Sequence, residues 1–115
     1  MSVDFKPPIR TARGASVRLR EALVELAGEH AQMTRQSERA WASITFEGAR
    51  HTFELAFSGH IAVADGEAFI AELPDHEFSI PGQLVAEATV VAVDHTLVPE
   101  PRMTVTCELL LLKDA

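Results

Sequence analysis

Two short runs of alternating apolar and polar residues constrain the fold of this chain more than any other feature. They lie in the segment AWASITFEGARHTFELAFSG, residues 40–59, on either side of Gly48-Ala49. Such alternation is typical of half-buried β-strands, and Gly at the first central position favours a type II′ turn. The pattern therefore predicts a tight hairpin, in which a slip of one residue would turn the phenylalanines toward water. Its predicted apolar face consists of Ala42, Ile44, Phe46, Phe53, Leu55 and Phe57.

His51 falls on this same apolar face, opposite Phe46 in the predicted register. Two interpretations are open. It is either a polar residue at the rim of the sheet near the turn, or a functional histidine.

The segment before the hairpin predicts an amphipathic helix. Ser16 is a residue type that caps helices, and apolar residues follow it at helical spacing. They are Leu19, Ala22, Leu23, Leu26 and Ala27. The helix either ends at Gly28 or continues through residues 29–39. Residues 1–14 contain two prolines and Gly14, and predict an arm that is loose or draped over the body.

The second half of the chain predicts a short helix and another hairpin. Asp65 is positioned to cap a helix that ends near Leu73, before Pro74. Residues 83–93 and 102–112 then read as two long strands joined by a loop. The order helix, hairpin, helix, hairpin predicts a single α+β domain over residues 1–115, with an antiparallel sheet of about four strands that helices cover on one face.

Two features of the second hairpin concern its outward face. The predicted register sets Glu87 opposite Glu108, an arrangement that costs up to about 1 kcal/mol. A neighbouring arginine, a shared proton, a metal or a different register would remove that cost, and an exposed pair would lower it. The same face is apolar enough to need a cover, and so predicts a contact between copies of the chain. The predicted contact residues are Val85, Val91, Leu110 and Leu112.

Composition excludes several classes of function. The chain has 115 residues and a formal charge of −7, and lacks a basic run, which disfavours nucleic acid as a partner. No stretch approaches the ~20 apolar residues of a membrane span, and the N-terminal residues lack the apolar segment of a signal peptide, so we expect a cytoplasmic protein. Cys107 is the only cysteine, and its place in a strand predicts a buried structural thiol.

The most conspicuous polar group is Asp75-His76-Glu77, in AELPDHEFSIPG, residues 71–82. Three consecutive residues cannot all converge on one point, so at most two of them serve as ligands, with help from His60 or from Asp94-His95. The alternative is a polar turn at the exit of a helix. The chain has no metal-binding spacing and no serine-hydrolase, dinucleotide or P-loop motif. No catalytic residue, metal or cofactor is predicted, and the candidate ligand-binding residues are Asp75, His76, Glu77 and His60.

Residues 81–112 begin with Pro-Gly and continue into two long strands, and this segment resembles part of the hot-dog proteins. That resemblance implies an acyl-thioester hydrolase or dehydratase that dimerises through its sheet. The residues themselves favour a non-enzymatic oligomeric or partner-binding module. The alternative is a hot-dog-like enzyme, or a small-ligand-binding protein with a pocket between the second helix and the sheet.

Overall fold

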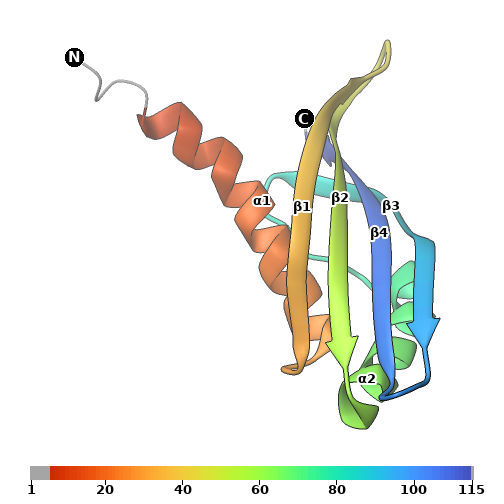
Figure 1. The fold of residues 1–115 in the computed structure, drawn as a ribbon. Coiled ribbons are helices and arrows are strands. Elements are labelled where there is room, and N and C mark those ends of the chain that lie inside the picture. The colour runs from red at the N-terminus through yellow and green to blue at the C-terminus, as the bar shows by residue number, and fades with distance from the viewer. Residues whose placement is uncertain (1–5, 115) are drawn as a thin grey trace.

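The computed structural model describes residues 6–114, and their side chains from residue 14 onward. The predicted class and element order, α-β-β-α-β-β, are confirmed (Figure 1). The elements are α1 (Lys6–Ala27), β1 (Ala31–Ala42), β2 (Glu47–Ser58), α2 (His60–Glu72), the short 3-10 turn η2 (Leu73–Asp75), β3 (Gln83–Thr96) and β4 (Arg102–Lys113).

The four strands form one antiparallel sheet in the order β1-β2-β4-β3. The two hairpins are therefore joined through β2 and β4, which are the central strands, while β1 and β3 are the edges. Both helices pack on the same face of the sheet, α1 toward the β1 side and α2 across the lower end of the central strands (Figure 1).

The core lies between this face and the helices. Leu19, Leu23 and Ala27 of α1 are buried, as their helical spacing predicts. The central strands β2 and β4 supply the largest share of the remaining core, because each lies between two other strands and the helices cover its inward face. The buried inward residues of the sheet are His51, Phe53, Leu55, Phe57, Met103, Val105, Cys107, Leu109 and Leu111.

Helix α1 begins earlier than predicted and ends at the first of the two predicted positions. Its start at Lys6 makes most of the predicted arm helical, since Pro7 and Pro8 occupy the first turn, where a backbone N–H has no helical partner. Residues 1–5 of that arm lie outside the described residues. Gly28 follows the last helical residue with φ of 99° and donates its N–H to Val24 O at 3.0 Å. This left-handed residue turns the chain into β1.

The first hairpin turns at residues 43–46, so the predicted turn at Gly48-Ala49 is wrong. The hydroxyl of Ser43 organises the observed turn by accepting hydrogen bonds from the backbone N–H groups of Thr45 and Phe46, at 3.3 and 3.1 Å. Residues 31–39, which the sequence left as a possible continuation of the helix, form most of β1 instead.

Gly48 lies within β2, where it pairs with Trp41 on one side and Leu112 on the other. A Cβ at this position would collide with the carbonyl of Leu111. The glycine therefore allows β2 and β4 to approach each other rather than forming the turn.

Helix α2 starts at His60, five residues before the predicted cap at Asp65. The N-cap position is Gly59, which donates its N–H to the carbonyl of Pro101 at 2.8 Å and accepts from Val63 N–H at 2.9 Å. The helix start is therefore held by the β3–β4 loop rather than by a side chain.

The second hairpin has the predicted strands and a different register. The shifts occur between Val85 and Glu87 and between Val90 and Ala92, where β3 is bulged. A bulge adds one residue and reverses which side chains face the helices. Cys107 is consequently paired with Val90 rather than with Ala88.

We predict that Gly48→Ala lowers the free energy of unfolding by about 1–3 kcal/mol, because the added methyl group must displace the backbone of β4. Urea unfolding followed by circular dichroism measures the change. Gly14→Ala is the matched control, since a Cβ there meets nothing within 4 Å and the position is helical. It should raise stability by up to about 1 kcal/mol. Equal stability of Gly48→Ala and the wild type would contradict the close approach.

Candidate functional site

Asp75, His76 and Glu77 lie where η2 ends, and all three side chains are exposed. The backbone N–H of His76 donates to Leu73 O at 3.3 Å, which closes the 3-10 turn. The imidazole packs edge-on against Phe78, with ring centroids 4.6 Å apart. These contacts are those of a helix-exit turn.

His60 occupies a different part of the molecule. It is the first residue of α2 and lines an open hollow of about 260 Å³ between this helix and the β3–β4 loop. The 13 residues of α2 separate it from the turn by about 20 Å. The structure therefore does not bring His60 together with Asp75, His76 or Glu77.

The hollow beside His60 contains two further titratable residues, His95, which the sequence offered as a possible helper, and Glu67, which it did not. Glu67 is seven residues after His60, two helical turns along the same face, so helical spacing contained a signal for this pair. His95 comes from β3, and its approach depends on the pairing of the strands. The rest of the lining is Val63, Ala64, Leu97 and Pro101.

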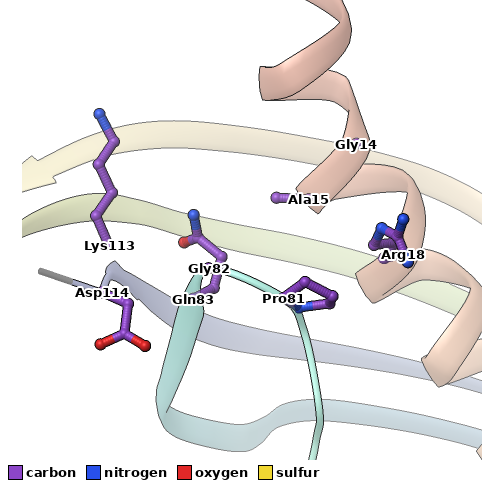
Figure 2. Close-up of a pocket in the computed structure, with 8 residues that line it drawn as sticks. All are labelled: Gly14, Ala15, Arg18, Pro81, Gly82, Gln83, Lys113 and Asp114. Carbon is purple, nitrogen blue, oxygen red and sulfur yellow. The ribbon is translucent and has the colours of Figure 1, made fainter.

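A second open groove, of about 550 Å³, lies between α1 and the ends of β3 and β4 (Figure 2). Its charged side chains are Arg18, Lys113 and Asp114. Figure 2 shows that the ammonium group of Lys113 and the carboxylate of Asp114 point in different directions, and that Arg18 lies on the far side. Lys113 is instead paired with Glu47 at 3.1 Å. These groups do not converge on a common point.

Within residues 6–114, no three His, Cys, Asp or Glu side chains gather closely enough to hold a metal ion. Over the same part of the chain, neither helix combines the length and the apolar character that crossing a membrane requires.

Cys107 is fully buried in β4, as predicted for a structural thiol. Burial raises the pKa of the Cys107 thiol to about 12. A thiol in this state is protonated at neutral pH and is a poor nucleophile.

The outward face of the sheet explains the predicted pair of opposed carboxylates. In the observed register Glu87 lies opposite Leu110, and Glu108 lies opposite Thr89. Arg50 bridges the two carboxylates, with its Nη1 3.4 Å from Glu87 and 3.8 Å from Glu108. A different register and a neighbouring arginine, two of the four proposed explanations, therefore both apply.

The predicted contact residues between copies do not form one exposed patch. Val85 faces the helices and packs against the core, because the bulge after it changes the side of the strand that each residue occupies. Leu110 and Leu112 point outward and are only 6% and 7% exposed. Val91, at the second bulge, is 48% exposed. The predicted outward orientation is therefore wrong for Val85. It is right for the two leucines, but little of their surface is exposed.

Two of the nine exposed large apolar side chains among the described residues, Ile44 and Phe46, lie at the tip of the first hairpin. Ala42 and Glu47 pair with each other beyond Gly48–Leu112, the last pair that joins β2 to β4. The hairpin thus projects past the rest of the sheet (Figure 1). Ile44 is fully exposed and Phe46 is 49% exposed. The sequence placed both in the core because the predicted turn was four residues away.

His51 is the one buried polar or charged residue among the described side chains, and not a rim residue as predicted. Its ring stacks on Phe53, with centroids 6.3 Å apart and planes at 10°. Its Nδ1 has no hydrogen-bond partner, and Glu38 Oε1 is 3.7 Å away. Burial lowers the pKa of His51 below its usual value of 6.5, against an opposing effect of Glu38.

We predict that His51 makes the protein less stable as the pH falls from about 7 to about 5.5. Because its folded-state pKa is lowered, the unfolded chain binds more protons in this window, and the free energy of unfolding decreases. His51→Leu should reduce that pH dependence and add about 1 kcal/mol near pH 6, since it removes a buried nitrogen without a partner. Urea unfolding at the two pH values measures both effects. His76→Leu, at an exposed position, is the matched control, and an unchanged slope in His51→Leu would contradict the assignment.

No protein-family model and no curated protein matches the sequence. Among solved structures, a chain in the virion of native gene transfer agent (GTA) particle is similar to it, with a TM-score of 0.56 and 13% sequence identity. The superposition covers 90% of this chain and 94% of that chain. At this identity, the likeness establishes a shared fold.

Proposed function

We propose that this chain is a structural subunit that assembles with copies of itself in the cytoplasm, as part of a multi-subunit particle, and that it has no catalytic site of its own. The observation that carries the proposal is the projecting hairpin, with Ile44 and Phe46 at its tip. Covering a fully exposed Ile and a half-exposed Phe with a protein surface removes apolar area from water and lowers the free energy.

The distribution of polar groups supports a structural role over a chemical one. The residues that the sequence selected as ligands lie at opposite ends of α2, and His51 is enclosed in the core. The only thiol is buried and protonated at neutral pH. General acid–base or nucleophilic chemistry needs such groups within reach of one another and of a substrate.

The shared fold adds a second line of support. The similar chain belongs to a virion particle, and its fold matches nearly the full length of both chains. A fold can serve many functions, so the likeness supports the proposal only together with the exposed hairpin.

We predict that the wild-type protein forms assemblies of several copies between about 1 and 100 µM, and that Ile44→Ser with Phe46→Ser weakens assembly about tenfold or more. The two serines remove the apolar surface that another copy would cover, while the turn contacts of Ser43 stay in place. Sedimentation velocity and native mass spectrometry measure the association.

Val17→Ser is the control, because Val17 is also half exposed but lies on α1. It should leave association unchanged. Thermal unfolding of each variant shows whether the fold is intact. A wild-type protein that stays monomeric over the whole concentration range would contradict the proposed function.

The small-ligand alternative is favoured by one observation, the hollow that His60 shares with Glu67 and His95. Two imidazoles and a carboxylate around Val63 and Leu97 would suit a small acid with an apolar part. Its 260 Å³ lies just below the usual range for ligand pockets, about 300–1,000 Å³.

For this alternative, we predict that a small carboxylic acid that stabilises the wild type in a thermal-shift screen loses its effect in His60→Ala. The loss is expected because the imidazole lines the hollow directly. His76→Ala is the matched control, since its side chain lies at the other end of α2. The same thermal shift in His60→Ala as in the wild type would exclude this hollow as the binding site.

A further inference from the structure

The sheet ends in two edge strands whose charges have opposite signs on the face turned away from the helices, while Glu38 of β1 lies on the other face beside His51. On the face turned away from the helices, β1 carries Arg35 and Arg39. On the same face, β3 carries Glu87 and Asp94, and this strand has no Lys or Arg. Within the described chain, neither strand has a partner on its outer side.

The segments around these edges also differ in charge. Residues 14–42, the part of α1 and β1 whose side chains the structure describes, contain four Arg and four Glu. Residues 60–96, from α2 to β3, contain seven Asp and Glu and no Lys or Arg. The formal charges of the two segments are therefore 0 and −7, so the β3 side of the sheet is the more negative one.

From this complementarity we infer that copies of the chain assemble head to tail, with the β1 edge of one copy along the β3 edge of the next. The inference rests on the proposed function as a self-assembling subunit and adds a contact along the sheet edges to the one proposed at the hairpin tip. Contacts between two β1 edges or two β3 edges would oppose like charges, whereas the head-to-tail contact opposes unlike ones.

The pairing within the sheet shows which residues meet. Arg39 lies opposite Arg50, and that row continues through Leu110 to Glu87. A neighbouring copy at the same height therefore places its Arg39 beside Glu87. Arg35 lies in the row that ends at Ala92, two residues from Asp94. The two arginines and the two carboxylates thus face each other along one junction.

The strand directions are compatible with this junction. All neighbouring strands are antiparallel and the sheet has four of them, so β1 and β3 point in opposite directions. A copy related by translation, or by rotation about an axis parallel to the strands, consequently meets its neighbour in antiparallel orientation. The sheet then continues from copy to copy, as a ring if the rotation closes and as a filament if it does not.

Bulges restrict how much backbone can pair across the junction. β1 has a shift between Met33 and Arg35 and is regular over residues 35–42. β3 is regular over residues 87–90 and 92–96. Bulges at sheet edges oppose indiscriminate pairing. Side-chain charges, rather than a full-length ladder, therefore select the partner.

Reversing the charges tests the junction. We expect Arg35→Glu with Arg39→Glu, and separately Glu87→Lys with Asp94→Lys, to weaken assembly about tenfold or more, because each change opposes like charges. The chain with all four substitutions should assemble as the wild type does, since its edges are again complementary. About 1 M NaCl should weaken the wild-type assembly. Sedimentation velocity measures each affinity.

Arg18→Glu with Arg20→Glu and Glu67→Lys with Glu72→Lys are the matched controls. They change the net charge equally at exposed helical positions outside the two edge strands, and should weaken assembly less than the edge reversals do. Restored assembly in the fourfold variant supports the junction. If the wild type assembles and both edge-reversal variants assemble equally well, this inference is overturned and the proposed function stays intact. A monomeric wild type would overturn both.

Cross-linking tests the same contact without charge reversal, in case a reversed chain does not fold. A mixture of Arg39→Cys and Glu87→Cys chains should form disulfide-linked dimers under mild oxidation. Each chain alone should form few, since Cys107 is buried. If the Arg39→Cys chain alone forms as many disulfide-linked dimers as the mixture, the head-to-tail arrangement is overturned.

Discussion

The pairing of β2 with β4 is the interaction on which the rest of the structure depends. It connects residues near position 50 with residues near position 110 and extends from Gly48–Leu112 to Ser58–Arg102. Without it the chain would have two separate two-stranded ribbons, each of marginal stability in water. With it, Phe53 meets Cys107 and Leu55 meets Val105 on a single inward face that the helices can cover. The close backbone approach at Gly48 lets this pairing reach the end of β4.

The elements that bury one face at a regular spacing could be predicted from the sequence. The α1 stripe and the inward residues of β2 follow the helical and strand periods because packing against the core requires it. Residues 31–39 of β1 were missed because they form an edge strand with mostly exposed side chains, and its sequence AQMTRQSERAWA has no apolar period. Gly48-Ala49 was read as a turn although its glycine serves the contact with β4. The bulges near Ala86 and Val91 left no signal in the alternation, and they moved Val85 to the helix side.

In the candidate site, too, features set by neighbouring residues could be predicted from the sequence, and features set by distant segments could not. The turn at Asp75-His76-Glu77 follows from local sequence, because Pro74 and the helix before it dictate the chain direction. The pair of His60 and Glu67 was available from helical spacing only if the helix began at His60, and the predicted cap at Asp65 left His60 outside it. Its association with His95 was not available, since that depends on where the β3–β4 loop meets the start of α2, through Gly59 and Pro101. Residues from distant segments are placed together only by the order of strands in the sheet.

The features that hid β1 in the sequence also bear on how copies of the chain meet. An apolar and regular edge strand would pair with any exposed strand and aggregate. Here the edges have bulges and charges, and the chain has a net charge of −7, which keeps copies apart in most orientations. Repulsion is least where the arginines of β1 meet the carboxylates of β3. A polar edge therefore does not exclude assembly. In the assembly proposed above, it restricts contacts to the orientation in which the charges are complementary, and such a restriction would distinguish an ordered particle from an aggregate.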